Sequence, residues 1–157
     1  MELIVIPLVI VLLLLFIRNL TSTKPTPVDF QFELQSNLLS DAENKFYQFL
    51  VSKINETEYK VMAKVRLADI FRCTNEGKLR HSGFNRIKAK HFDFVIINNL
   101  SSKIICAIEL DDKSHNRKSA VKNDMFKNKV CADTNLKLIR VKVAKYYNDN
   151  TLRELGL

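Results

Sequence analysis

The stretch FDFVIINNLSSKIICAIEL, from Phe92 to Leu110, decides the fold of this chain. It contains two apolar runs separated by a segment rich in asparagine and serine, which is the pattern of two β-strands joined by a hairpin. The second run is apolar at nearly every position, as is typical of a strand in the middle of a sheet. We therefore predict strands over 92–97 and 104–110 that pair through the turn between them.

Further elements are predicted on both sides of the hairpin. Ser40 and Glu43 form a capping-box pattern at the start of a helix. Before the hairpin we predict a helix over 41–54, a strand over 59–65, a short helical turn or irregular connection over 66–71 and a polar, basic loop over 72–91. After it we predict a helix over 116–132, whose inward residues are Ala120, Val121, Met125 and Val130, then a strand over 136–143 and a short helix after residue 150.

The order of these elements predicts an α/β fold. The last strand returns across a helix, which implies a parallel crossover, whereas the hairpin is antiparallel. We therefore expect a three-layer-like sandwich with a central mixed β-sheet flanked by helices.

An uncharged apolar segment over residues 3–17 precedes this domain. It is shorter than the roughly 20 residues of a spanning helix, but its neighbours extend it. A cleaved signal peptide would need a basic start and a small-residue cleavage site, and neither is present. We therefore expect an N-terminal transmembrane helix, with a membrane anchor over 1–20, a linker over 21–37 and the α/β domain over 38–157. The basic residues that follow the helix place the domain on the cytoplasmic side of a single-pass protein.

The charge and cysteine content narrow the function classes. The chain has 25 Lys+Arg against 17 Asp+Glu, a net charge of +8, which predicts an anionic partner such as nucleic acid or an anionic membrane surface. Cys73, Cys106 and Cys131 share no metal-ligand spacing, which argues against a zinc-finger site and a disulfide framework. Basic residues flank the hairpin in two groups, Lys78, Arg80, Arg86, Lys88 and Lys90 before it, and Lys113, Arg117, Lys118, Lys122, Lys127 and Lys129 after it. They indicate either a phosphate-backbone groove or a solubilising surface.

Two carboxylates, Asp93 and Glu109, lie in the predicted strands of the hairpin, and a third, Asp111, directly follows the second strand. Pairing through the turn places Asp93 opposite Glu109 or near it, with Cβ atoms about 4.5–5.5 Å apart. Two carboxylates at that distance repel unless a cation lies between them, and Mg²⁺ takes such oxygen ligands. Asp111 lies two residues beyond Glu109 and shares its face. The pair therefore indicates a candidate metal site.

Plainer interpretations of the same residues remain open. Asp93 could pair with Arg140, and the acids from Glu109 to Asp112 could form a solvated turn after the strand. His115 could begin a helix, and Glu43 could serve the capping box alone. We expect Lys64 and Arg66 to be solvated.

Five blocks occur in one order: LLSDAENKFYQFL, KVRLADIF, NRIKAKHFDFVI, AIELDDKSH and LKLIRVKV. Over about residues 38–143 this pattern resembles the PD-(D/E)XK nuclease-like superfamily, near the very-short-patch-repair-type endonucleases. Within that superfamily it looks most like the bacterial family named domain of unknown function 2726. The resemblance implies a restriction-endonuclease-like fold and Mg²⁺-dependent phosphodiester hydrolysis of nucleic acid. That family often carries a four-cysteine zinc ribbon, and none is expected here.

The resemblance also implies roles for individual residues. Asp93 and Glu109 match the metal-binding acids, Glu43 matches a helical acid that orients a metal-bound water, and His115 matches a general acid or base. Asp111 stands where the superfamily usually has a lysine that polarises the nucleophilic water or stabilises developing charge. With Asp at this position, the role of the lysine passes to His115, Lys113 or Lys90, or the activity is altered or lost.

The residues that we expect to bind nucleic acid are Lys88, Lys90, Lys113, Arg117, Lys118 and Lys122. The alternative function is a catalytically inactive module on the same fold that binds nucleic acid, anionic lipid or a protein. The sequence leaves open the substrate, the biological pathway, the oligomeric state and whether the apolar segment is retained.

Overall fold

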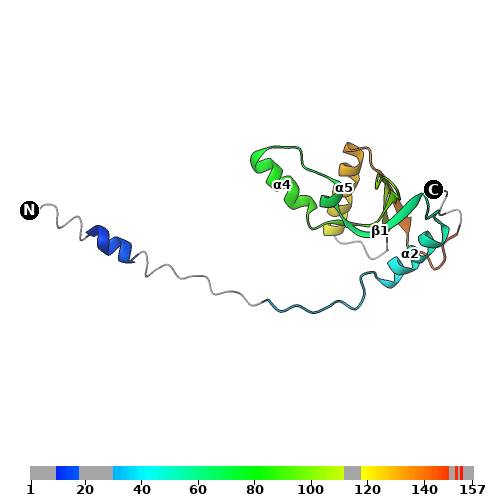
Figure 1. Ribbon diagram of the computed structural model, residues 1–157, viewed down its shortest axis with the longest axis horizontal. Helices are drawn as coiled ribbons and strands as arrows, with labels where there is room; N and C mark the ends of the chain where they lie inside the picture. The colour runs from blue at the N-terminus through cyan, green and yellow to red at the C-terminus, as the bar shows by residue number, and fades with distance from the viewer. Residues whose placement is uncertain (1–9, 18–29, 112–117, 149–150, 152, 154–157) are drawn as a thin grey trace, which may run out of the picture. The chain divides into compact units, whose positions relative to one another are not determined.

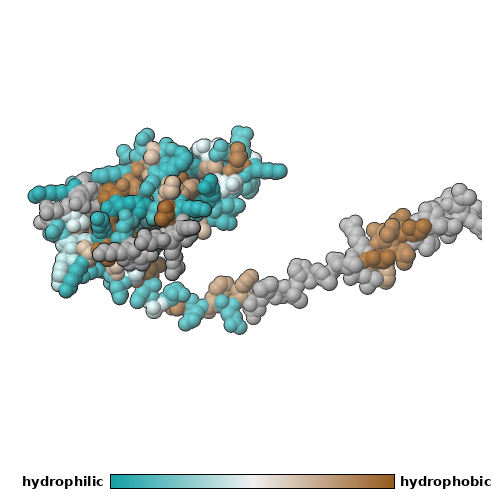
Figure 2. Space-filling model, turned by 180° about the vertical axis from the view of Figure 1, so that it is seen from behind, coloured by the Kyte–Doolittle hydropathy of each residue, from teal (hydrophilic) through white to brown (hydrophobic). Residues whose placement is uncertain are grey.

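The computed structural model describes residues 10–17, 30–111, 118–148, 151 and 153. Two compact units divide the chain, Met1–Ser36 and Asn37–Leu157. In the first unit, residues 10–17 form a helix with hydrophobic side chains on all sides, seen in brown in Figure 2. These eight residues are the part of the apolar segment that the structure describes.

The predicted transmembrane helix is wrong, because no helix in the described part of the chain is long and apolar enough to span a membrane. The prediction rested on the uncharged apolar stretch over 3–17, of which the structure describes residues 10–17.

The second unit is an α/β domain with a four-stranded mixed sheet (Figure 1). Its elements are α2 (Asp41–Lys53), β1 (Tyr59–Arg66), α3 (Leu67–Ile70), α4 (Gly77–Ile87), β2 (His91–Asn98), β3 (Ile104–Asp111), α5 (Lys118–Asp133) and β4 (Lys137–Lys142). The strands lie in the order β1-β2-β3-β4. The first two pairings are antiparallel and the β3–β4 pairing is parallel, as expected from the helix between those strands.

The register of the β2–β3 hairpin shifts by one residue on the way from the turn to Asp93, since Ile97 pairs with Ile104 but Ile96 pairs with Cys106. Phe94 pairs with Ile108 and Val95 with Ala107, and an irregularity follows between Ile96 and Ile97. One step beyond the Phe94–Ile108 pair, the same register brings Asp93 level with Glu109. The hairpin thus places both acids at one end of the sheet.

Helices cover both faces of the sheet. On one face, Phe46 and Leu50 of α2 pack in a buried cluster with Phe94 and Ile108. On the other face, a second cluster contains Leu67 of α3, Ile87 of α4, Cys131 of α5, and Val95 and Ala107 of the sheet. Because neighbouring strand residues point to opposite faces, β2 and β3 are buried on both sides. The three layers agree with the predicted sandwich.

Two predictions about the helices were wrong. The stretch 72–91 was expected to be a loop, but it contains α4, whose buried residue is Ile87 and whose other side chains are largely polar. In α5, Val121 and Met125 were expected to face inward, but they are 50% and 66% exposed, while Cys131 is buried. The helix places Lys127 and Cys131, four residues apart, toward the sheet, so its inward face carries a charge and shows little hydrophobic periodicity.

Candidate functional site

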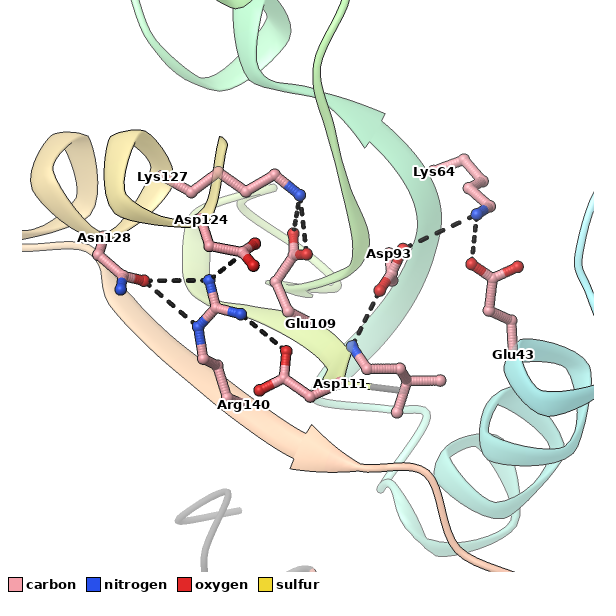
Figure 3. A network of polar contacts seen from close by, with 10 residues as sticks. Glu43, Lys64, Asp93, Glu109, Asp111, Asp124, Lys127, Asn128 and Arg140 are labelled. Atoms are coloured by element: carbon pink, nitrogen blue, oxygen red, sulfur yellow. Dashed lines mark hydrogen bonds and ion pairs between the residues drawn. The ribbon is translucent and has the colours of Figure 1, made fainter. Parts of the chain in front are cut away.

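A cleft of about 440 Å³ lies where the C-terminal end of β3 meets the N-terminal end of β2. The charged residues that line it come from α2, the three strands β1, β2 and β3, the segment before β2, and α5: Glu43, Lys64, Lys90, Asp93, Glu109, Asp111, Asp124 and Lys127. Figure 3 shows most of them close together, in three groups of polar contacts: Glu43 with Lys64 and Asp93, Lys127 with Glu109, and Arg140 with Asp111, Asp124 and Asn128. The fold therefore brings together four of the five residues predicted to be catalytic.

Asp93 is held by the backbone of the neighbouring strand. Its Oδ2 accepts a hydrogen bond of 2.9 Å from the backbone N–H of Leu110, and its Oδ1 lies 3.7 Å from Nζ of Lys64. Its side chain is 15% exposed. The described ion pair of Asp93 is thus with Lys64, and the alternative in which it pairs with Arg140 is wrong.

Lys64 reaches the cleft through an unusual backbone conformation in the middle of β1. Its φ is 54°, in the left-handed region that non-glycine residues rarely adopt. On either side, Ala63 pairs with Phe94 and Val65 with Phe92, while no pairing is assigned at Lys64. Ala63 then packs in the α2-side cluster and Val65 in the opposite one. The backbone therefore turns over at Lys64.

This turn sends the Lys64 ammonium between two acids, Glu43 and Asp93. Its side chain is 24% exposed, so the prediction that Lys64 is solvated was wrong. Arg66, by contrast, is 64% exposed and pairs with Asp69, as a solvated residue does. Strand alternation carries no signal for a left-handed residue, and the sequence therefore gave no indication of this lysine.

Glu43 serves both the helix cap and the cleft. Its Oε2 accepts a 2.8 Å bond from the Ser40 backbone N–H, which completes the capping box, and its Oε1 accepts a bond from Lys64. Burial acts to raise the pKa of Glu43, but the bonds from Lys64 and Ser40 outweigh it and hold that pKa below its ordinary value. Glu43 is therefore a charged member of the cleft as well as a structural cap.

Glu109 is the one buried charged residue in the described part of the chain, at 6% exposure. Nζ of Lys127 donates to both of its carboxylate oxygens, at 2.6 and 2.7 Å. Burial raises the pKa of Glu109 to about 7, with Asp93 adding to the rise and Lys127 opposing it. Glu109 is therefore poised to gain or lose a proton near neutral pH.

Asp111 belongs to a separate network on the β4 side of the cleft. Its Oδ1 accepts a 2.7 Å bond from Arg140, which also contacts Asp124 at 3.3 Å and Asn128 at 3.2 Å. Asp111 thus lines the cleft, but its carboxylate is held by a cation on the neighbouring strand. Arg140 was considered only as a partner of Asp93, and its contact with Asp124 was not predicted, because that contact depends on how α5 packs over β4.

The remaining predicted residues divide into three groups. Lys113, His115 and Arg117 lie outside the described residues, as does the side chain of Lys118. Lys88 and Lys122 are exposed. Lys90 lines the cleft, with its ammonium 5.6 Å from the ring centroid of Phe126.

His91 is a cleft residue that the sequence analysis missed. Burial lowers its pKa, and the nearby ammonium groups of Lys64 and Lys127 lower it further. A neutral imidazole at the rim of the cleft can accept a proton. The sequence signal that could have identified His91 is its position directly before the predicted strand that contains Asp93.

Comparison with known proteins places the domain in a family. The family model described as "Protein of unknown function (DUF2726)" matches residues 35–155, which include every element from α2 to β4. The chain belongs to this family. A search of curated proteins and a search of solved structures each found no match.

In this DUF2726 domain, the donor chemistry of the cleft fits a small hard cation. Five carboxylates, those of Glu43, Asp93, Glu109, Asp111 and Asp124, face the cations of Lys64, Lys90, Lys127 and Arg140. Among the described residues, no group of three or more His, Cys, Asp or Glu is arranged to hold a metal ion. Magnesium needs only one or two protein carboxylates, because water and substrate phosphate complete its shell. Asp93 and Glu109 are the two cleft carboxylates that the sequence predicts for this role.

Proposed function

We propose that the domain is a metal-dependent phosphodiesterase of the PD-(D/E)XK nuclease-like type, acting on nucleic acid. The observation that carries this proposal is the hairpin register, which puts Asp93 level with Glu109 in a cleft that also contains Glu43 and Lys64. The net charge of +8 supports a polyanionic substrate.

Asp93 and Glu109 would hold Mg²⁺, which supplies a bound water of lowered pKa and neutralises charge on the phosphate. Each acid forms an ion pair with a lysine in the structure: Glu109 with Lys127, and Asp93 with Lys64. The two lysine ammonium groups act as internal counter-ions to these carboxylates. A divalent cation would compete with Lys127 for the oxygens of Glu109.

In the hydrolysis, a water oxygen forms a bond to phosphorus and the bond to the leaving ester oxygen breaks. One proton leaves the water, and the leaving oxygen gains one. Asp111 occupies the position where a lysine is usual, and it cannot supply a positive charge. Lys64 supplies that charge instead, since its ammonium lies beside Asp93. A fixed cation of this kind stabilises negative charge that develops on phosphate oxygens. His115 is proposed as the general acid or base. His91, whose pKa is lowered by burial and by nearby ammonium groups, is an imidazole that lines the cleft.

The test is cleavage of labelled DNA and RNA oligonucleotides by the full chain with Mg²⁺ or Mn²⁺. We expect Asp93→Asn and Glu109→Gln to abolish cleavage and to weaken divalent binding measured by calorimetry. Asp133→Asn is the matched control, because Asp133 is an exposed acid paired with Lys129 on α5 and does not line the cleft. Cleavage that persists in both cleft variants would rule out the proposed site.

The alternative is a catalytically inactive module on the same fold that binds nucleic acid, anionic lipid or a protein partner. It is favoured by the ion pairs that neutralise the cleft acids and by Asp111 at the position where a lysine is usual. This alternative predicts that the chain binds its partner without divalent ions and that Asp93→Asn leaves binding unchanged. Measurable divalent binding lost in that variant would favour the enzyme instead.

A further inference from the structure

A second hollow, of about 720 Å³, lies between α3 and α4. Its apolar lining includes Ala68, Phe71 and Phe84, and its polar side chains include Arg72, Arg80 and His81. None of these residues lines the cleft of the candidate site. An aromatic surface bordered by guanidinium groups suits a planar ring that carries a phosphate.

The segment that forms one side of the hollow is uniformly basic. Between residues 77 and 92 the sequence contains five Lys or Arg and no Asp or Glu. The exposed cations on and after α4 include Lys78, Arg80, Arg86 and Lys88. A helix with this charge is complementary to a polyanion, and it repels other cationic surfaces.

Phe84 is unusual for a residue on such a helix, since it is 51% exposed although Ile87, three positions later, is buried. Phe71 is half-buried and meets the ring of Phe92 edge-on at 6.2 Å, which holds it in place. Single-stranded nucleic acids are bound by aromatic side chains that stack on bases, within a groove of positive charge. The hollow contains both features.

The fold holds this arrangement through two glycines. A side chain at Gly83 would collide with the thiol of Cys73, so glycine allows α4 to approach the segment that carries Arg72. Gly77 begins the helix with φ 54°, and its carbonyl lies 3.1 Å from Nδ1 of His81. The position of α4 relative to Arg72 therefore follows from the local sequence.

The same segment connects the hollow to the candidate active site. After α4 ends, Lys90 and His91 line the cleft. Arg86 and Lys90 both lie over the ring of Phe126, at 5.1 and 5.6 Å from its centroid. Cationic side chains thus continue from the hollow to the acids of the cleft.

We propose that the hollow between α3 and α4 is a nucleobase-binding subsite for single-stranded nucleic acid. An unpaired base stacks on Phe84, and Arg72 and Arg80 contact the adjoining phosphates. A base inside a duplex is stacked and paired and does not enter the hollow. The subsite depends on the nucleic-acid partner of the proposed function, but not on cleavage.

The test is fluorescence anisotropy of a labelled single-stranded oligonucleotide with the full chain, in EDTA so that no cleavage occurs. We expect Phe84→Ala to weaken binding by about 5- to 150-fold, the range for one stacked base. Leu79→Ala is the matched control, because Leu79 is a 67% exposed apolar residue of the same helix that does not line the hollow. It should change binding by less than about 2-fold, as for a residue without a stacked base.

Two further variants separate stacking from general hydrophobicity. Phe84→Trp should keep tight binding, whereas Phe84→Leu should behave like Phe84→Ala, and circular dichroism with thermal melting checks that each variant folds. Arg80→Ala should lower the salt dependence of binding by about 0.7 in log–log slope, the value for one phosphate contact on a single strand. Lys60→Ala, an exposed lysine of β1, serves as its control.

The proposal is overturned if Phe84→Ala and Leu79→Ala bind equally well, if a duplex of the same sequence binds as tightly as the single strand, or if no oligonucleotide binds. Binding of anionic vesicles that depends on Phe84, without oligonucleotide binding, would assign the surface to lipid. Cleavage tests the other proposal separately. If Asp93→Asn abolishes cleavage but still binds the single strand, the result supports both sites. If Phe84→Ala binds the single strand as tightly as the wild type, the result rules out the subsite and leaves the proposed active site untouched.

Discussion

Replacing Glu109 by glutamine should change how the stability of the domain depends on pH. Glu109 is buried, and burial raises its pKa to about 7 from an ordinary value of 4.5. The folded state therefore binds this proton more tightly than the unfolded state does. The stability that the group contributes is fully present below pH 4.5 and is lost as pH rises through about 7.

The size of the effect follows from the two pKa values. Their difference is about 2.5, and each pH unit corresponds to about 1.4 kcal/mol, so Glu109 should lower the free energy of unfolding by about 3 kcal/mol between pH 4.5 and 8. Glu109→Gln keeps the shape and an oxygen that accepts from Lys127, but it does not titrate. Relative to the wild type, the variant should therefore become about 3 kcal/mol more stable across this window.

The assay is urea unfolding of both proteins in EDTA at several pH values. Subtracting the two free energies at each pH removes the titration of all other groups, provided that they are unchanged. Asp133→Asn, which alters an exposed acid, should show no such trend. A difference that is constant, or that falls as pH rises, would refute the reasoning, since it would mean that Lys127 outweighs burial and keeps the carboxylate ionised.

Three more results are expected. Lys64→Met should reduce the cleavage rate about 100-fold or more with the fold retained, because it removes the cation beside Asp93. Lys60→Met is the control and should leave the rate unchanged. Equal cleavage rates for the two variants in kinetic assays would contradict this role of Lys64. Ser40→Ala should lower the free energy of unfolding by about 1 kcal/mol in urea titrations, since it removes the cap of α2, and no loss would contradict the capping role. Gly83→Ala should destabilise by about 1–3 kcal/mol in the same assay, and adding Cys73→Ala should restore part of this; strictly additive effects would show that the two positions do not clash.

The sequence by itself determined the hairpin and the sheet around it. Strand periodicity, the asparagine- and serine-rich turn and the crossover helix were sufficient for the mixed sheet and for bringing Asp93 near Glu109. The turn sets the pairing next to it, but the one-residue shift between Ile96 and Ile97, after which the register levels Asp93 with Glu109, was not predicted. The same reasoning failed for α4, where polar and basic residues resembled a loop. It also failed for the apolar segment over 3–17, where composition suggested a membrane-spanning helix but no described helix is long and apolar enough to span a membrane.

Only the tertiary structure decided which cations accompany the acids. Lys64 enters the cleft through a left-handed residue inside a strand, and Lys127 enters from the inward face of α5, which the hydrophobic pattern had assigned to Val121 and Met125. Asp111 is turned to Arg140 by the parallel β3–β4 pairing. A pKa is set by burial and by neighbours that are distant in sequence, so the carboxyl of Glu109 could be located from the chain alone, but its proton affinity could not.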